Sequence, residues 1–287
     1  MEHTTVAAGD GYPLSAHTFG DAHAARAAVL VVPAMGVEQQ HYAAFAHWLA
    51  ARGYFVVTFD YRGIGRSRRG SLRQLDADVL TWAEQDTGAM VAHVRERAAG
   101  KPLFWVGHSL GGQILPLVPG HEHVNAMVTV AAGSGYWRDY APGLKRVAPL
   151  LWFVIVPLSI PLAGYFPGRL LRMIGDLPAG VMRQWRSWCL DPDYLFGVMP
   201  AAVSERYGAL KLPLLSLSFT DDEYLSEKNI QSLHGFYAGA ARDMRRIAPA
   251  DIGVAGIGHF GFFRRRFEAS LWPRAGDWLD RQAGAQH

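Results

Sequence analysis

Short runs of apolar residues alternate along most of the chain with longer segments whose apolar residues recur at helical spacing. The short runs predict β-strands at 4–8, 14–19, 28–32, 55–59, 103–107, 126–131, 213–219 and 245–248. The longer segments predict helices at 39–52, 76–99, 226–240 and 265–282, the last with a kink near Pro273. Because strands and helices alternate, we expect an α/β fold, with a mostly parallel central sheet and helices on both faces. The first two strands flank a Gly-Asp-Gly turn signal and are expected to form a hairpin.

The segment 134–207 departs from this alternation, because it is too long for an ordinary connection between a strand and a helix. It is also rich in tryptophan, tyrosine and phenylalanine. We therefore expect a largely helical cap, inserted into a core that is made of residues 1–133 and 208–287. The cap side chains expected to contact a substrate are Trp137, Trp152, Phe153 and Trp185.

Within this cap, the stretch 147–166 has no charged residue and is flanked by Lys145, Arg146 and Arg169. Its length suits a membrane span. Three prolines interrupt it, however, and a span would divide a core whose strands must pair in one sheet. We expect its apolar side chains to be buried against the core and the substrate, as the wall of a pocket. A cap surface that rests on a membrane is the remaining alternative. The three prolines are Pro149, Pro157 and Pro161.

Composition and charge narrow the possible functions. Half of the 287 residues are hydrophobic, which is enough for one large domain with an insertion. The formal net charge is only +3 and no lysine-rich block is present, so nucleic acid is not an expected partner. The single cysteine, Cys189, allows no intramolecular disulfide, and the N-terminus lacks the features of a signal peptide. These observations predict a cytoplasmic protein.

The most specific chemical signal is a Gly-His-Ser-Leu-Gly motif at 107–111, directly after the predicted strand 103–107. Gly-X-Ser-X-Gly between a strand and a helix is typical of a nucleophile elbow, which exposes a serine hydroxyl at a sharp turn. A Cβ at either glycine is expected to collide with the neighbouring backbone. With a helix expected at 110–118, the surroundings favour Ser109 as a nucleophile.

A serine hydroxyl becomes an effective nucleophile when a base removes its proton during the attack. The candidate base is His259, which lies in a loop between the last predicted strand and the last predicted helix. Two other histidines follow the strand at 213–219. Of these, His234 falls within a predicted helix, where it is expected to be a polar helix-face residue, and His287 ends the chain.

An acid that orients the base should lie at the carboxyl end of the strand 213–219. Three acidic residues follow that strand without interruption, which are Asp221, Asp222 and Glu223. One of them is expected to meet the imidazole. For the other two we expect a favourable interaction with the dipole of the helix that follows. Spacing favours Asp222 over Asp221 only slightly, so both stay open as the acid.

In these motifs the chain resembles the α/β-hydrolases, and in particular a group of bacterial predicted hydrolases. The resemblance covers most of the core but not the cap, and it implies an α/β-hydrolase fold. It also implies that the acid is Asp222, although the proline that usually follows in the family is missing here. The segment 60–67 resembles a structural turn of the family and is expected to have a packing role. The motifs concerned are Ala34-Met35-Gly36, Asp60-Tyr61-Arg62-Gly63-Ile64-Gly65-Arg66-Ser67, Gly107-His108-Ser109-Leu110-Gly111-Gly112, Asp221-Asp222-Glu223-Tyr224 and Gly258-His259-Phe260-Gly261.

These residues together predict a cofactor-free serine hydrolase that cleaves a carboxylic ester with an apolar acyl group. The main-chain N–H groups of Met35 and Leu110 are expected to stabilise the oxyanion. A thioesterase, an amidase or an acyltransferase could use the same three residues, and a binding protein could keep the fold without catalysis. The complete set of Ser109, His259 and an acid favours an enzyme over a binding protein.

Two further patterns do not support other functions. The Gly-X-Gly-X-X-Gly pattern at 256–261 lacks the strand and acidic residue that a dinucleotide site needs afterwards. The His-Glu-His sequence at 121–123 lacks further metal ligands at a suitable spacing, so a solvated turn is expected. We therefore expect neither a cofactor nor a metal. The run of arginines at 264–266 has no evident role in the predicted chemistry.

Overall fold

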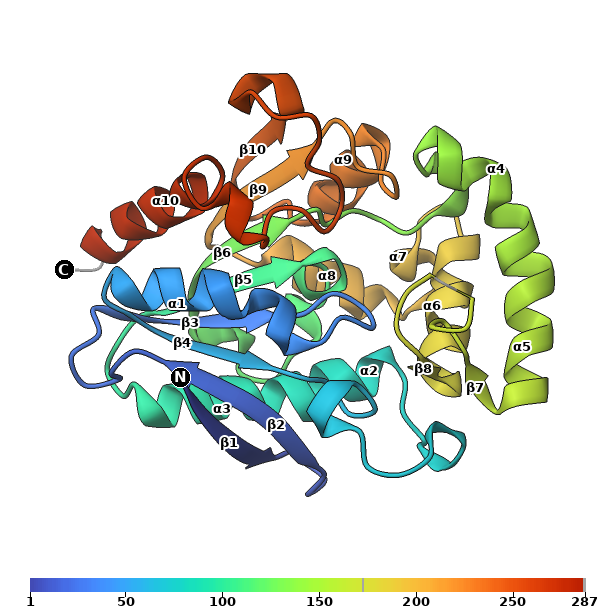
Figure 1. The fold of residues 1–287 in the computed structure, drawn as a ribbon, viewed down its shortest axis with the longest axis horizontal. Coiled ribbons are helices and arrows are strands. Elements are labelled where there is room, and N and C mark those ends of the chain that lie inside the picture. The colour runs from blue at the N-terminus through green and yellow to red at the C-terminus, as the bar shows by residue number, and fades with distance from the viewer. Residues whose placement is uncertain (172, 286–287) are drawn as a thin grey trace.

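The computed structural model describes residues 1–171 and 173–285 and contains a central eight-stranded sheet (Figure 1). The order is β1-β2-β4-β3-β5-β6-β9-β10, in which β1 pairs antiparallel with β2, and β2 with β4; all other pairs are parallel. This confirms both the mostly parallel sheet and the N-terminal hairpin. The strands are β1 (Glu2–Ala7), β2 (Pro13–Phe19), β3 (Ala27–Val32), β4 (Tyr54–Phe59), β5 (Leu103–His108), β6 (Val124–Val130), β9 (Pro213–Phe219) and β10 (Ala241–Ile247).

Helices cover both faces of the sheet, which explains why the central strands are apolar throughout. On β3, Leu30 belongs to the core on one face and Val29 and Val31 to the core on the other. The first core includes residues of α2 (Val79–Thr81), the π-helical turn η4 (Trp82–Thr87), α3 (Gly88–Arg97) and α9 (Glu227–Phe236). The second core includes residues of α1 (Ala43–Ala51) and α10 (Trp272–Gly284).

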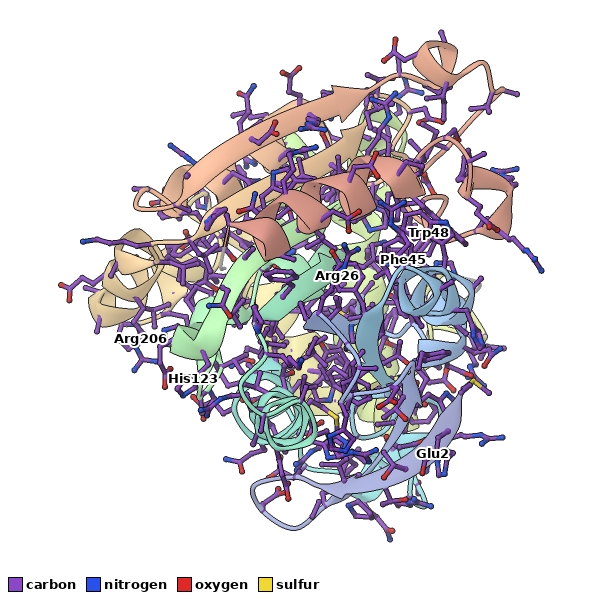
Figure 2. All side chains as sticks on the ribbon, turned by 90° about the vertical axis from the view of Figure 1, so that its left-hand side faces the viewer. Glu2, Arg26, Phe45, Trp48, His123 and Arg206 are labelled. Carbon is purple, nitrogen blue, oxygen red and sulfur yellow. The ribbon has the colours of Figure 1, made fainter. Side chains whose placement is uncertain are left out.

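Helices α1 and α10 pack against each other through aromatic side chains (Figure 2). The Trp272 ring contacts Phe45 and Trp48, with ring centroids 5.5 and 5.8 Å apart. Helix α10 begins at Trp272, later than predicted, after a separate 3-10 turn at Arg265–Phe267. Pro273 therefore lies in the first turn of α10, where no helical hydrogen bond is lost, and the predicted kink is wrong.

The segment 134–207 folds mainly as helices beside the carboxyl ends of the central strands (Figure 1). Its regular elements are α4 (Pro142–Leu150), the π-helical turn η9 (Leu151–Ile155), α5 (Val156–Ala163), β7 (Tyr165–Phe166), β8 (Leu177–Pro178), α6 (Ala179–Leu190), α7 (Leu195–Val198) and α8 (Ala201–Ala209). The short strands β7 and β8 pair antiparallel outside the main sheet.

One helical segment runs without a break from Pro142 to Ala163 through α4, η9 and α5. The expectation that the prolines break it is wrong. The helical segment continues through all three prolines: Pro149 lies inside α4, Pro157 and Pro161 lie in α5, and the wide π turn η9 stands between Pro149 and Pro157. Among the described residues, this is the one helix long and apolar enough to cross a membrane, and 28% of its most apolar window is buried.

Candidate active site

A serine stands at the turn that follows β5. Strand β5 ends at His108, and Ser109 has a φ of 50°, in the left-handed region that residues with a side chain rarely adopt. A Cβ at Gly107 would lie 2.2 Å from the carbonyl oxygen of Gly111, and a Cβ at Gly111 would lie 2.2 Å from that of Val32. Both predicted collisions are confirmed, so this turn requires both glycines.

The segment after Ser109 differs from the predicted helix at 110–118. It consists of two 3-10 turns, η5 (Ser109–Gly112) and η6 (Leu115–Leu117). The two adjacent glycines at 111 and 112 disfavour an α-helix, and Pro116 has no N–H group to continue one. The prediction of a long helix is therefore wrong. Leu110 follows Ser109 directly and is buried in η5.

His259 and Asp222 meet although 37 residues separate them in the chain. Both are buried, and His259 Nδ1 lies 2.8 Å from Asp222 Oδ2. The other carboxylate oxygen, Oδ1, accepts hydrogen bonds from the main-chain N–H groups of Tyr224 and Leu225, at 2.8 and 2.9 Å. The carboxylate is thus held by the backbone on one side and accepts the Nδ1–H of His259 on the other. In this tautomer His259 Nε2 is free to take a proton.

The acidic residues on either side of Asp222 also contact the loop that carries His259. Asp221 Oδ2 accepts hydrogen bonds from the N–H groups of Ile257 and Gly258, at 2.7 and 3.2 Å. Glu223 Oε2 accepts one from the N–H of His259, at 2.9 Å. Sequence reasoning missed this arrangement, because it treated the two flanking acids as partners of the following helix.

The following helix, α9, has a cap of its own. Ser226 Oγ accepts a hydrogen bond from the N–H of Asn229, and the Asn229 side chain accepts one from the N–H of Ser226. This reciprocal pair satisfies the free N–H groups at the start of the helix. The carboxylates of 221–223 are therefore available to the loop of His259.

A buried hydrogen-bond chain links the loop after β3 to the loop of His259. The N–H of Ala34 donates to Tyr42 Oη at 2.8 Å, and Tyr42 Oη lies 2.9 Å from His108 Nδ1. His108 Nε2 lies 3.1 Å from the main-chain oxygen of His259. That oxygen can only accept, so His108 Nε2 carries the hydrogen and His108 Nδ1 accepts from the Tyr42 hydroxyl. Burial lowers the pKa of His108 well below its usual value, which keeps the ring neutral.

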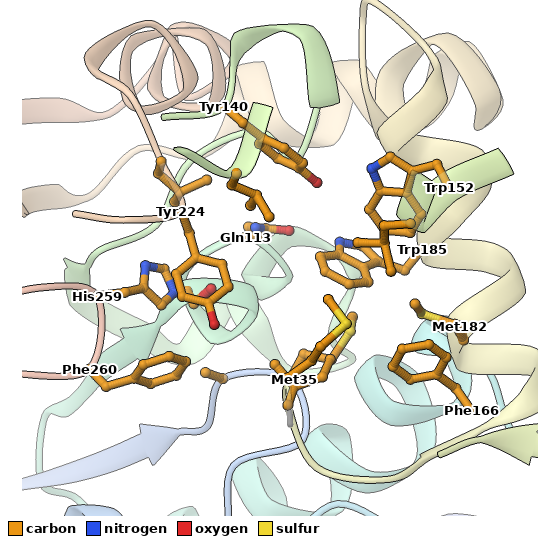
Figure 3. Close-up of a pocket in the computed structure, with 18 residues that line it drawn as sticks. Met35, Gln113, Tyr140, Trp152, Phe166, Met182, Trp185, Tyr224, His259 and Phe260 are labelled. Carbon is orange, nitrogen blue, oxygen red and sulfur yellow. The ribbon is translucent and has the colours of Figure 1, made fainter. Parts of the chain in front are cut away.

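Ser109 and His259 open onto one pocket between the core and the segment 134–207 (Figure 3). The pocket holds about 750 Å³ of empty space, including the part open to solvent. His259, Tyr224 and Phe260 lie at one end of it, and Trp152, Trp185, Met182 and Phe166 lie at the other. The Ser109 hydroxyl has no hydrogen-bond partner among the residues that the structure describes. It is thus free to face a bound molecule.

Three of the residues predicted to contact a substrate or to stabilise an oxyanion line this pocket, namely Met35, Trp152 and Trp185. Two others do not. Trp137 lies outside the lining, and the Phe153 side chain is 53% exposed and contacts the Trp137 ring, with ring centroids 6.1 Å apart. Their role as substrate contacts therefore stays a prediction, which the lining of this pocket does not support.

Several lining residues were not predicted from the sequence. Tyr224 packs its ring against His259, with ring centroids 4.9 Å apart, and Phe260 also lies 4.9 Å from that ring. Gln113 and Tyr140 add a side-chain amide and a hydroxyl group to the pocket lining (Figure 3). Phe260 directly follows His259, and Tyr224 lies two residues after Asp222; this closeness to predicted catalytic residues was the one signal in the sequence that could have indicated them.

The comparison of the sequence with known families decides where the chain belongs. Residues 23–172, just over half of the chain, match the hydrolase family described as serine aminopeptidase, S33. The protein is an α/β-hydrolase. No curated protein matches its sequence closely enough to extend the comparison.

Solved structures show the same fold for the whole α/β-hydrolase. A monoglyceride lipase from Saccharomyces cerevisiae is 16% identical, with a TM-score of 0.67, covering 98% of this chain and 94% of its own. An esterase from Pyrococcus furiosus is 14% identical, with a TM-score of 0.64 and coverages of 98% and 90%. Alpha/beta hydrolase domain-containing protein 10 from mouse is 15% identical, with a TM-score of 0.57 and coverages of 98% and 99%. At these identities the likeness concerns the fold.

The remaining candidates from the sequence lie apart from the pocket. His234 is a buried residue, not a polar helix-face residue, since its Nε2 lies 2.9 Å from Thr129 Oγ1 and its Nδ1 lies 2.7 Å from the main-chain oxygen of Ile230. His121 and His123 stand in a surface 3-10 turn. Within 1–171 and 173–285, no group of three histidine, cysteine or acidic side chains could hold a metal. His287 lies outside the described residues.

The segment 60–67 packs against the core of the α/β-hydrolase. Arg62 lies in a buried ion pair with Asp86, 2.7 Å from Nε to Oδ1, and also bonds Asp10. The Asp60 carboxylate accepts hydrogen bonds from the N–H groups of Gln39 and Arg66, at 2.7 and 3.0 Å. These contacts agree with the expected packing role of the segment.

Proposed function

We propose that this α/β-hydrolase cleaves carboxylic esters with an apolar acyl group, through Ser109, His259 and Asp222. The observation that carries the proposal is the pocket itself. A serine in a strained turn and an imidazole held by a buried carboxylate face the same space, which is otherwise lined mainly by apolar side chains. Such an arrangement suits acyl transfer to a serine.

In the proposed reaction, Ser109 Oγ attacks the carbonyl carbon of the ester while His259 Nε2 takes its proton. Asp222 keeps the imidazole in the required tautomer and stabilises its cationic form. The N–H groups of Leu110 and Met35 stabilise the oxyanion. His259 then donates the proton to the leaving alkoxide. A water molecule, activated by His259, releases the acid from the acyl-enzyme.

The pocket lining favours an ester over a peptide as substrate. The family is described as serine aminopeptidase, and an aminopeptidase has to bind the ammonium group of a peptide N-terminus. Among the described residues, no aspartate or glutamate lines the pocket. An ammonium group buried there would lack a counter-charge, which is costly. The aromatic and aliphatic walls suit an acyl chain, and esterase and lipase neighbours share the fold.

We also propose that the segment 134–207 acts as a cap over the core formed by 1–133 and 208–287. The proposal is supported by the lining of the pocket, to which this segment contributes Leu144, Trp152, Phe166 and Trp185. A substrate bound near Ser109 would lie between these side chains and the carboxyl ends of the central strands. The cap would then determine which acyl groups fit.

A fluorophosphonate probe combined with a substrate panel tests the proposal. The probe should label wild-type protein, and Ser109→Ala should abolish labelling without changing the melting temperature, because an activated serine attacks phosphorus as it attacks a carbonyl. Turnover of p-nitrophenyl esters of graded chain length should greatly exceed turnover of aminoacyl p-nitroanilides. A folded wild type that is neither labelled nor active would favour a binding protein. Preference for the anilides would show a peptidase.

A further inference from the structure

The helical segment from Pro142 to Ala163 has an exposed side that is apolar along its length. Helices α4 and α5 form the outer edge of the molecule at the right of Figure 1. The exposed fractions on this side range from 43% for Val154 to 81% for Leu162. The side chains recur every three or four residues, so they share one face of the helix. We call this set the outer apolar face; its members are Val147, Leu150, Phe153, Val154, Leu158 and Leu162.

The opposite side of the same helix is also apolar but is covered by protein. Leu151 and Trp152 are buried and line the pocket, and Val156 and Ile160 are buried further along. The expectation that the apolar side chains of this stretch are all buried is therefore wrong. A helix that is apolar on every side is typical of a protein interior or of contact with lipid. Trp137 and Arg186 contact the Phe153 ring, yet every member of the outer apolar face is at least 43% exposed.

The charged residues of this helix have one sign. The helix contains Lys145 and Arg146 and no acidic residue, and the nearest acidic residue before it in sequence, Asp139, is paired with Lys228. Lys145 and Arg146 are exposed in the first turns of the helix, directly before Val147. A second copy of the chain placed on the outer apolar face would bring the same basic residues toward each other. A surface with negative charge would complement them.

We propose that the outer apolar face docks on the surface of a lipid bilayer that contains anionic lipids. The apolar side chains would enter the boundary between headgroups and acyl chains, with Lys145 and Arg146 at the level of the headgroups. The helix lies in the plane of the membrane and does not span it, because its other side packs against the pocket. This inference does not depend on the proposed ester chemistry.

Docking in this way would bring the pocket close to the lipid. Leu151 and Trp152 on one side of the helix line the pocket, and Leu150 and Phe153 on the other side belong to the outer apolar face. One helix thus separates the pocket from the proposed membrane surface. Apolar substrates dissolved in the bilayer would have a short path to Ser109.

Vesicle co-sedimentation of the full-length protein tests the docking. We expect binding to vesicles of phosphatidylcholine with about one-third phosphatidylglycerol, and much weaker binding to phosphatidylcholine alone. The double variant Leu158→Glu, Leu162→Glu should bind the anionic vesicles at least tenfold more weakly, since carboxylates would have to enter the acyl region. Lys145→Gln and Arg146→Gln should each weaken binding about fivefold. Thermal unfolding monitors the fold of every variant.

Met244→Glu is the matched control. Met244 is an apolar residue of similar exposure, 43%, but lies on β10 away from the helix. Met244→Glu should leave vesicle binding unchanged. Equal loss of binding in Met244→Glu would overturn the proposal, as would wild-type protein that binds neither kind of vesicle. A dimer that Leu158→Glu dissociates would show that a second copy covers the face. Resistance to extraction by alkaline carbonate would show a membrane span.

Discussion

His108 Nε2 donates a hydrogen bond to the main-chain oxygen of His259, 3.1 Å away, across 151 residues of sequence. The donor directly precedes Ser109 and the acceptor belongs to the proposed base. The same ring accepts a hydrogen bond from Tyr42, whose oxygen also binds the N–H of Ala34, next to Met35. One buried chain of hydrogen bonds therefore connects the loops that carry the proposed nucleophile, base and oxyanion donor.

Tyr42→Phe should weaken this connection without touching the pocket lining. The variant leaves the N–H of Ala34 and His108 Nδ1 without partners, which should lower the free energy of unfolding by about 1–3 kcal/mol. Small displacements of both loops should lower kcat by about tenfold or more, with little change in KM. Steady-state kinetics on a short ester and denaturant unfolding would measure the two effects.

Tyr12→Phe provides the control for that variant. The Tyr12 hydroxyl donates to the main-chain oxygen of Ser67, 2.7 Å away and outside the pocket lining. Tyr12→Phe should lower the free energy of unfolding without lowering kcat. Equal loss of kcat in the two variants would mean that the hydrogen-bond chain through His108 has no special role in positioning.

The three adjacent acids should differ sharply when each is replaced by its amide. Asp222→Asn should lower kcat by about 10³–10⁴-fold, because the amide disfavours the required tautomer of His259. In Asp221→Asn and Glu223→Gln, a side-chain oxygen can still accept from the main-chain N–H groups, so losses below about tenfold are expected. His259→Ala should be at least as damaging as Asp222→Asn. If Asp221→Asn proved the most damaging of the three, the acid would be Asp221.

Replacing Trp152 should change the acyl-chain preference, whereas replacing its neighbour Phe153 should not. Trp152 is fully buried and lines the pocket, whereas Phe153 is exposed on the outer apolar face. Trp152→Ala should increase kcat/KM for longer acyl chains relative to acetate, and it should cost about 3–5 kcal/mol of stability. Phe153→Ala should leave the preference unchanged. Assays of p-nitrophenyl esters without lipid would measure both; unchanged preference in Trp152→Ala would mean that this residue only supports the cap.

Acid should destabilise the fold partly through His234. Burial lowers the pKa of His234 from 6.5 to about 4. Between pH 4 and pH 6.5, His234 binds fewer protons in the folded protein than in the unfolded chain. The free energy of unfolding therefore falls as the pH falls through this window. The contribution reaches at most about 3 kcal/mol. His234→Gln should flatten the pH dependence, as measured by denaturant unfolding on both sides of the window. Identical profiles would show that His234 does not titrate there.

Local patterns in the sequence determined the order of strands and helices and the place of the serine turn. Apolar periodicity reports which residues of one element share a face, and this depends only on residues that are close in sequence. Gly107 could be interpreted in the same way, because the collision it avoids is with Gly111 in the same short turn, whereas Gly111 avoids a collision with Val32 on β3 and was expected from the motif. His259 could be proposed because its loop follows the last strand.

Only the tertiary structure decided which acid meets the imidazole and which side of the long helix is covered. Three acids of like charge are adjacent in sequence, namely Asp221, Asp222 and Glu223. The path of the backbone gives each of them a different hydrogen-bond donor in the loop of His259. From Val147 onwards the helix has apolar residues on all sides, so their spacing does not indicate which side faces the core. Burial of Trp152 and exposure of Phe153 follow from what packs against each side, and those contacts come from residues distant in sequence.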